Sequence, residues 1–241
     1  MISKDMYHVY LTHLLKGDRR ACIDIVQRLL NNGIALETLY VDLFQKSLYR
    51  VGKLWELNEI SVAREHLATT LTESLMDMAY PHLPQIAVSA QKVVVACTAN
   101  ELHQVGGRMA ADMFQFHGWD AHYIGADNPL GHLLTFVDEE QPDLVGLSCS
   151  MYFNLPQLIQ AIESLRENFN HMDLCVGGQV FNWGGEEVLS RFKNIEYIED
   201  LNALSVQLGG DGRWWSCLKP ISATRRRCSS LKWMPKGTFY P

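Results

Sequence analysis

Glu101 and His103 are the residues in this sequence whose types and spacing suit metal chemistry best. They are separated by one residue and follow shortly after the apolar run Val93–Cys97. A neutral imidazole is a good ligand for a borderline transition metal, and a nearby carboxylate can accept the proton of its second ring nitrogen. The same pair at a helix start is more often part of an ordinary solvated loop. Other residues must therefore decide between the two interpretations.

Small and hydroxyl residues follow two further apolar runs at defined distances. Forty-one residues separate Gly106 from Ser148, which Ser150 follows closely, and twenty-six residues separate Ser150 from the pair Gly177 and Gly178. In an open parallel sheet, ligands bind beyond the carboxyl ends of the strands. Glycine permits the backbone to approach a large buried group where a Cβ would collide. Together with Glu101-x-His103, these positions predict one binding site at one edge of a sheet.

This combination resembles the cobalamin-binding domain whose pattern is D/E-x-H-x-x-G, followed at similar distances by S-x-L and G-G. The resemblance implies His103 as the lower ligand of cobalt and Glu101 as the carboxylate that orients it. It also implies contacts of Gly106, Ser148, Ser150, Gly177 and Gly178 with the displaced nucleotide tail. Glu101 stands where Asp is commoner and Ser150 where many members have Leu. A nucleotide-binding Rossmann domain fits less well, because no G-x-G-x-x-G follows the first apolar run.

A second group of residues lies in the N-terminal part. Trp55 is followed, after nine residues, by Glu65 and His66. This W-x9-E-H resembles the cap signature of light-sensing cobalamin regulators. The resemblance implies that Trp55 covers an adenosyl group and that Glu65 and His66 contact its ribose and base. The same residues also suit a bundle-core aromatic and a solvated helix start, and that interpretation stays open.

The resemblance leads us to expect an adenosylcobalamin-dependent photoreceptor that regulates transcription through a protein partner, with a light-dependent oligomer as a further possibility. Methylcobalamin and hydroxocobalamin are the other forms that the site would take. Glu56 stands where members of this regulator class have a second cobalt-binding histidine, so His66 or water would take the upper position after illumination. The helices begin almost at Met1, without a winged helix-turn-helix, which argues against direct DNA binding.

Two other functions use the same predicted site. A corrinoid methyl carrier would shuttle a methyl group between two methyltransferases with the same histidine and cobalt. A simple cobalamin carrier would be indifferent to the upper ligand. We expect a regulator rather than an enzyme, and if an enzyme component, the corrinoid protein of a methyltransferase system. Isomerase chemistry is disfavoured because this chain has no room for a substrate barrel.

The elements that must position these residues are readable from hydrophobic periodicity. Residues 1–83 predict four amphipathic helices, residues 84–91 a linker with Pro84, and residues 92–209 an alternation of apolar strands and helices. The predicted fold class is therefore α/β, with a four-helix-bundle cap followed by a Rossmann-like, flavodoxin-like, five-stranded parallel cobalamin-binding domain.

Composition and net charge argue against nucleic-acid binding and against a membrane span. The chain has 241 residues, 47% hydrophobic and 20% charged, with a net charge of −6, which argues against a general nucleic-acid binder. No apolar run is long enough to span a membrane, and six scattered cysteines favour reduced thiols, so we expect a cytoplasmic protein. Residues 210–241 carry seven basic residues and one acidic residue, and predict a disordered basic tail.

Overall fold

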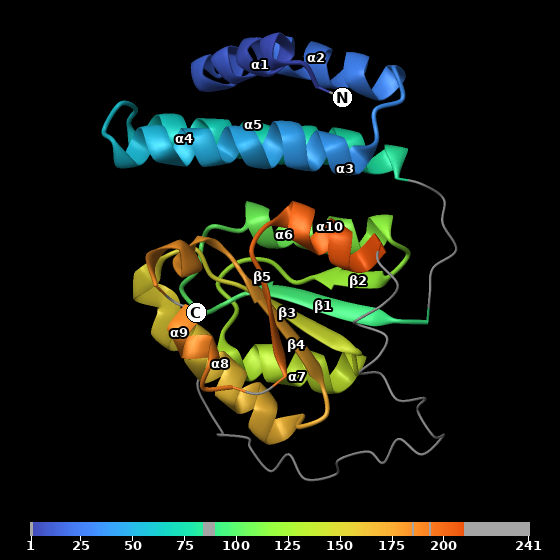
Figure 1. The fold of residues 1–241 in the computed structure, drawn as a ribbon, viewed down its shortest axis with the longest axis vertical. Coiled ribbons are helices and arrows are strands. Elements are labelled where there is room, and N and C mark those ends of the chain that lie inside the picture. The colour runs from blue at the N-terminus through green and yellow to red at the C-terminus, as the bar shows by residue number, and fades with distance from the viewer. Residues whose placement is uncertain (1, 84–89, 185, 193, 210–241) are drawn as a thin grey trace, which may run out of the picture.

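The computed structural model describes residues 2–83, 90–184, 186–192 and 194–209. It has a helical part that lies above an α/β part (Figure 1). The helical part contains these elements: α1 (Lys4–Lys16), α2 (Arg19–Asn31), α3 (Leu36–Leu39), a π-helix (Tyr40–Gln45), α4 (Lys46–Glu56), α5 (Val62–Ala79) and a 3-10 turn (Tyr80–His82). The predicted linker 84–91 falls mostly, and the predicted tail 210–241 entirely, outside the described residues.

The helix ends follow ordinary capping chemistry. The hydroxyl of Ser3 accepts from the backbone N–H of Met6, and the hydroxyl of Ser61 accepts from that of Arg64. Helix α1 ends at Gly17 with a φ of 71°, a conformation that glycine adopts without strain. These caps bound helix α1 at both ends and helix α5 at its start.

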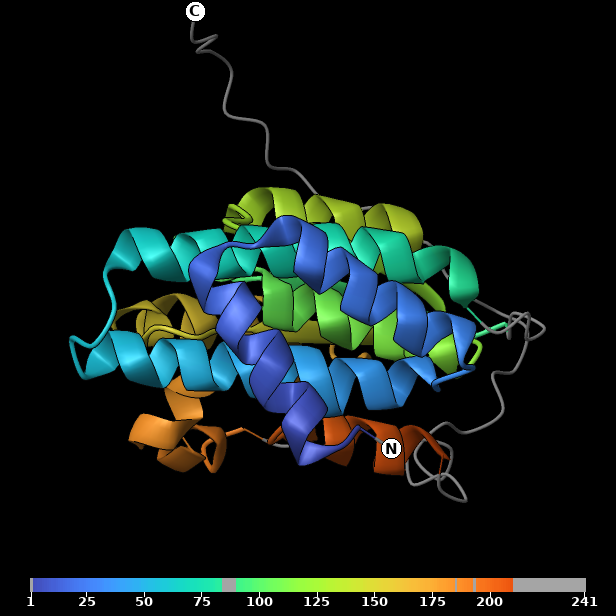
Figure 2. The same cartoon turned by 90° about the horizontal axis from the view of Figure 1, so that it is seen from above.

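The four predicted helices are present, with one difference. The third runs from Leu36 to Glu56 without a break, but its middle segment Tyr40–Gln45 is a π-helix. Seen from above, α1 and α2 cross over α4 and α5 (Figure 2). Large side chains fill the space between the two layers, among them the fully buried Tyr10, Phe44 and Leu75.

The α/β part is a five-stranded parallel sheet in the order β2-β1-β3-β4-β5, the flavodoxin-like order. Its strands are β1 (Lys92–Cys97), β2 (Asp120–Tyr123), β3 (Leu144–Ser148), β4 (Asp173–Gly177) and β5 (Ile195–Ile198). Cys97 pairs with Ser148, and Ser148 pairs with Gly177. The carboxyl ends of the three central strands are thus in register, so the loops that follow them begin side by side.

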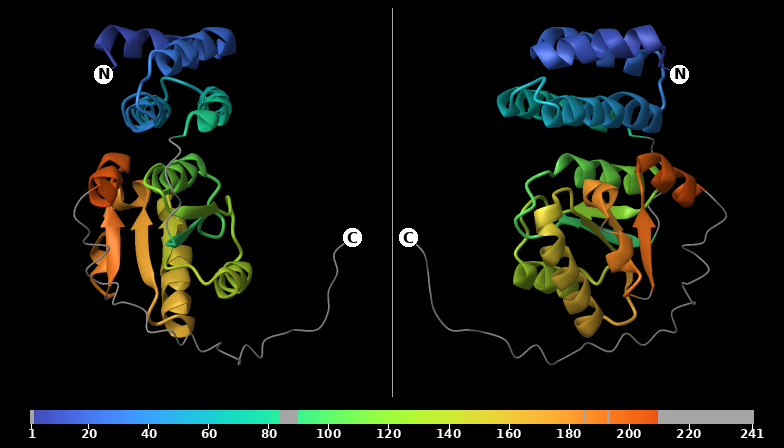
Figure 3. Two further views of the ribbon diagram at one scale, coloured as in Figure 1. Left: turned by 90° about the vertical axis from the view of Figure 1, so that its right-hand side faces the viewer. Right: turned by 60° about the vertical axis from the view of Figure 1, so that its left-hand side comes forward.

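Helices cover both faces of this sheet. Helices α6 (Val105–Phe116) and α10 (Leu201–Gly209) lie between the sheet and the helical part, whereas α7 (Leu130–Glu140) and α8 (Leu155–Asn168) lie on the opposite face (Figure 1). The side views in Figure 3 show the same layers from α1 and α2 at the outside down to the sheet. Shorter elements complete the part: 3-10 turns at Tyr152–Asn154 and Gln179–Trp183, and α9 (Glu186–Leu189).

Polar contacts join the helical part to α6 and α10. Tyr40 donates a hydrogen bond of 2.8 Å to the buried carboxylate of Asp112, and Gln104 donates one of 2.8 Å to Glu73. Arg108 forms an ion pair with Asp77. These contacts hold the C-terminal half of α5 against α6, which leaves the α4–α5 connection projecting beyond α6.

The predicted α/β fold class, with its N-terminal helices and five parallel strands, is confirmed. Helix α10 was not predicted, although Asp200 directly precedes it and its carboxylate accepts from the backbone N–H of Ala203 at 2.7 Å. None of the helices in the described part of the chain is long and apolar enough to cross a membrane.

Candidate functional site

Glu101 is a buried carboxylate with an unusually complete set of hydrogen bonds. Its side chain is fully buried, directly after β1. One oxygen accepts from the backbone N–H of His103 at 2.9 Å, and the other accepts from the backbone N–H groups of Ser150 and Met151 at 2.9 and 3.0 Å. The amide of Asn154 donates to that second oxygen at 3.1 Å. The carboxylate therefore ties the loop after β1 to the loop after β3.

These hydrogen bonds decide the charge of Glu101. Burial by itself raises its pKa, but the donors from His103, Met151 and Asn154 outweigh burial and lower the pKa to about 2. The group is therefore ionised at neutral pH, although water does not reach it. A buried, ionised carboxylate with fixed lone pairs is a precise acceptor for one more donor.

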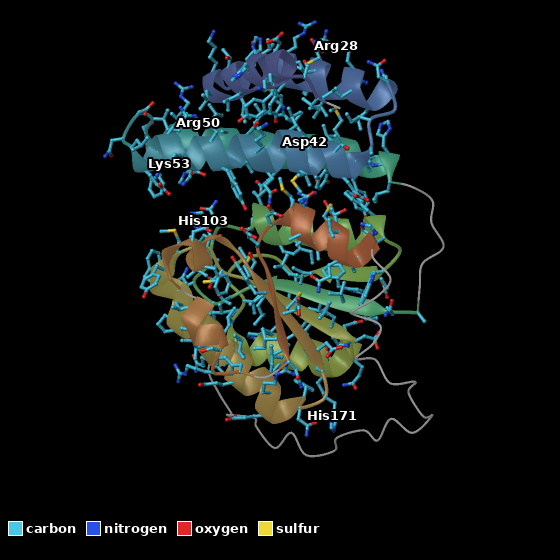
Figure 4. The ribbon with its side chains drawn as sticks, viewed as in Figure 1. Arg28, Asp42, Arg50, Lys53, His103 and His171 are labelled. Carbon is cyan, nitrogen blue, oxygen red and sulfur yellow. The ribbon has the colours of Figure 1, made fainter. Side chains whose placement is uncertain are left out.

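The imidazole of His103 supplies that further donor. Its Nδ1 lies 2.7 Å from Oε1 of Glu101, and this contact raises the pKa of His103. In the neutral ring, the carboxylate selects the tautomer with the proton on Nδ1, so Nε2 carries a free lone pair. Nε2 has no hydrogen-bond partner within the described ranges. His103 lies at the upper edge of the α/β part, facing α4, with half of its side chain exposed (Figure 4).

A cleft opens between His103 and the helical part. It holds about 1520 Å³ of space not filled by protein atoms, and this volume includes space that is open to solvent. Nine of the ten predicted site residues line it, and Glu101 lies behind His103. The nine are Trp55, Glu65, His66, His103, Gly106, Ser148, Ser150, Gly177 and Gly178.

The predicted glycines fall into two kinds. A Cβ on Gly106 would meet nothing within 4 Å, so this position opens into the cleft. A Cβ on Gly178 would lie 2.1 Å from the carbonyl oxygen of Cys149, and Gly178 has a φ of 114°. Gly178 is therefore required by the backbone itself, whereas Gly106 leaves space for a ligand.

The cleft continues beneath α6 and α10 as a narrow extension into the core, which we call the apolar slot. Its floor is formed by Val95, Gly146 and Cys175, which are neighbours on β1, β3 and β4. Its roof is formed by side chains of α6 and α10, and these are Met109, Ala110, Phe114 and Leu204. Most of these side chains are buried from solvent although they line the cleft, so this part of the cleft is apolar.

The upper wall belongs to α4 and α5. Gln45, at the end of the π-helix, and Tyr49 and Trp55 of α4 line the cleft. From α5, Glu65 and His66 line it, but the carboxylate of Glu65 already accepts a 2.8 Å hydrogen bond from Thr69. This wall is wetter than the lower one, since the side chain of His66 is 73% exposed.

The sequence did not reveal several of these residues. Asn154 reaches Glu101 across 53 positions, a distance at which a single sequence carries no signal. Gly146 did leave a signal, because a glycine inside a buried strand often marks a close approach. In the part of the chain that the structure describes, no three His, Cys, Asp or Glu side chains gather into a metal-binding group.

Comparison with known proteins adds the identity of the two parts. A B12 binding domain model matches residues 91–200, and a second B12 binding domain model matches residues 7–80. Dimethylamine corrinoid protein 3 of Methanosarcina mazei is 33% identical over 118 residues, which are 48% of this chain and 67% of that protein. The chain belongs to the family of B12-binding proteins. Its cofactor is cobalamin.

Two further proteins that are similar to this chain are also corrinoid proteins. Dimethylamine corrinoid protein 1 of Methanosarcina acetivorans is 29% identical over 135 residues, and the chain spans 61% of its length. The structure of the monomethylamine corrinoid protein of Methanosarcina barkeri superposes with a TM-score of 0.74 over 84% of this chain and 96% of that chain, at 13% identity. At that identity the superposition shows a shared fold alone.

The predicted light-sensing transcriptional regulator is wrong, because the matching curated relatives are corrinoid proteins. The W-x9-E-H spacing misled the prediction for a structural reason. Trp55 ends α4 and Glu65 begins the inner face of α5, so two antiparallel helices that cover a cleft place these residues opposite each other whatever lies beneath. The spacing thus identifies a cap but not the group under it. The expected light-dependent regulatory partner has no support either.

Proposed function

We propose that this B12-binding protein is a methyl carrier that serves a methyltransferase system. The observation that carries the proposal is the contrast across the cleft: a rigid imidazole on one side and an open, partly solvated cap wall on the other. The curated relatives, which are dimethylamine corrinoid proteins, support the same function. The partners would be methyltransferases, and the chain would carry the methyl group without catalysing either transfer alone.

The residues of the lower wall fit a cobalamin held by histidine. Nε2 of His103 would bind cobalt, because Glu101 occupies the other ring nitrogen. Ser148 and Ser150 line the cleft beside Gly106, where the open Cβ position leaves room for the corrin and its side chains. When bound, cobalamin supplies a cobalt ion that accepts and releases a methyl group.

The upper wall suits exchange rather than retention of a group. Trp55 is 38% exposed and lies at the rim of the cleft, where it can shield a small group from water without enclosing it. His66 is exposed, and Glu65 is already bonded to Thr69. A methyl donor and a methyl acceptor must reach the same face in turn, which an open wall permits. We assign residues 1–83 to this cap and residues 92–209 to the cobalamin-binding domain.

The proposal is tested by loading the protein with hydroxocobalamin and recording absorption spectra. We expect a spectrum in which histidine replaces the nucleotide base on cobalt, and its loss in His103→Ala. The loaded protein is then reduced with titanium(III) citrate and treated with iodomethane. We expect the bound cofactor to be methylated, and to lose the methyl group again to a corrinoid-dependent methyltransferase of a methylamine system.

Two results would contradict the proposal. One is a wild-type spectrum that His103→Ala does not change. The other is a bound cofactor that keeps its upper group under both treatments although free cofactor in the same vessel exchanges it. The variant His171→Ala serves as a control, since Figure 4 places that histidine at the far end of the molecule.

A further inference from the structure

Three large apolar side chains are exposed beside His103, on the loops that follow β1 and β3. Leu102, Tyr152 and Phe153 are 71, 56 and 67% exposed. Leu102 directly precedes His103 in the sequence, and the other two residues begin the 3-10 turn after β3. None of the three lines the cleft, so the space for a cofactor does not account for them. We call these three residues the apolar ridge.

The buried carboxylate of Glu101 fixes the backbone around the apolar ridge. It accepts from the backbone N–H groups of His103 and Met151, which adjoin the ridge in the sequence. The amide of Asn154, directly after the ridge, donates to the same carboxylate at 3.1 Å. A surface that is ordered before association loses less conformational entropy when a partner binds. The exposed side chains of the ridge thus stand on a backbone that is already ordered for contact.

The two loops that carry the ridge are poor in charge. Residues 98–104 and 148–157 contain no lysine or arginine, and their one carboxylate is that of the buried Glu101. A carboxylate stands at the border of the first loop, where Asp127 accepts from the backbone N–H of Asn100 at 2.8 Å. Exposed aromatic and aliphatic side chains with few charges among them are typical of the centre of a protein–protein interface, and polar groups are typical of its border.

The other wall of the cleft exposes apolar side chains as well. Trp55, Leu57 and Val62 are exposed at and beside the α4–α5 connection, and Trp55 and Val62 line the cleft. The cleft therefore has exposed apolar side chains at both of its walls. A protein that approaches the cofactor through this opening contacts apolar surface on its way.

We propose that the apolar ridge is the surface on which a methyltransferase docks, with an uncharged, apolar surface around its own active-site opening. The inference rests on the proposed methyl-carrier function, which requires two enzymes to reach the same cofactor in turn. Three side chains bury less area than the roughly 800 Å² per partner of a standard interface. A contact centred on them is weak and dissociates readily, which suits a carrier that must leave one enzyme for another.

The test compares the wild type with Leu102→Gln and Phe153→Gln after loading with cobalamin, reduction with titanium(III) citrate and methylation with iodomethane. Methyl transfer to a corrinoid-dependent methyltransferase of a methylamine system is followed by absorbance at increasing concentrations of the loaded protein. We expect each variant to raise the KM for the loaded protein at least about tenfold, because an amide replaces an apolar contact. Cobalamin affinity and the rate of methylation by iodomethane should stay within about twofold of wild type, since neither residue lines the cleft.

Control variants connect the effect to the apolar ridge. Val9→Gln makes a similar change at an exposed position of α1, in the outermost helical layer (Figure 3), and should leave the KM unchanged. Leu102→Met and Phe153→Leu keep an apolar surface and should stay within about threefold of the wild-type KM. Melting curves show whether each variant folds.

The outcomes separate the two proposals. A KM that Leu102→Gln and Phe153→Gln leave unchanged would overturn the docking surface, and a dimer of the wild type that both variants dissociate would then assign the ridge to a second copy of this chain. A loss of cobalamin affinity as large as the rise in KM would also overturn it, because the ridge would then hold the cofactor. Methylated wild type that gives no methyl group to the methyltransferase would instead refute the methyl-carrier function, and the docking surface with it.

Discussion

The two walls of the cleft differ in how firmly their polar groups are held. On the lower wall, the carboxylate of Glu101 is fully buried and accepts hydrogen bonds from four residues. On the upper wall, Trp55 is 38% exposed, and the side chain of His66 is 73% exposed. The lower wall is thus organised before any ligand arrives, and the upper wall is not.

This difference suits the lower wall to holding the cofactor and the upper wall to exchanging a group on it. A metal ligand binds tightly when neighbouring groups of the folded protein already hold it in the binding orientation, because no further free energy is then needed to order it. A group that must be passed between partners needs a surface that opens to them. The lower wall would therefore carry most of the binding free energy of cobalamin, and the upper wall would set access to it.

The largest expected effect is that of His103→Ala. Loss of the imidazole should weaken cobalamin binding by more than about 100-fold, because even loss of a group that orients a ligand costs up to that factor. Absorbance titration measures the change, and His171→Ala should bind as the wild type does. An affinity within a few-fold of wild type would show that the lower wall does not hold the metal.

Glu101→Gln should come next, with binding weakened about 10- to 100-fold. The amide keeps the shape of the side chain, but its NH₂ group faces donors that the carboxylate oxygens accept from, and His103 loses its charged partner. Titration of cobalamin gives the affinity, and thermal melting shows whether the loop also loosens. Glu139→Gln, at an exposed position of α7, is the matched control.

Two glycine variants should distinguish a glycine that leaves space for the ligand from a glycine that the backbone conformation requires. Gly106→Val should weaken cobalamin binding about tenfold or more while the apoprotein keeps its melting temperature, since its Cβ projects into open space. Gly178→Ala should lower the free energy of unfolding by about 2 to 3 kcal/mol, because its Cβ collides with Cys149 and its φ is positive. Similar melting losses in both variants would remove the distinction.

The smallest effect is expected for Trp55→Ala on the upper wall. Binding should weaken no more than about threefold, since a rim residue that stays partly exposed contributes little binding free energy. Leu57→Ala, exposed beyond the end of α4 and outside the cleft lining, is the control. A loss as large as that of Glu101→Gln would show that the cap also holds the cofactor firmly.

Much of the fold was predictable because it depends on local pattern. The apolar run at 144–148 and the helical spacing at 130–140 correspond to β3 and α7 as they stand in the structure. The π-helix at Tyr40–Gln45 was not predictable, because its buried residues Tyr40, Leu43 and Phe44 have the i, i+3, i+4 spacing of an ordinary α-helix. Helix α10 was missed although it has a cap: the carboxylate of Asp200 accepts a 2.7 Å hydrogen bond from the backbone N–H of Ala203.

The features of the candidate site likewise divide into those that the sequence predicts and those that depend on the folded structure. The sequence by itself determined His103, its carboxylate partner and the spacing of serines and glycines, since those are properties of residue type and order along the chain. Only the tertiary structure decided that Asn154 completes the buried network, that Gly106 is open while Gly178 is crowded, and that an apolar slot continues beneath α6 and α10. The physical reason is that burial, unpaired space and hydrogen bonds between distant residues exist only once strands β1, β3 and β4 lie side by side.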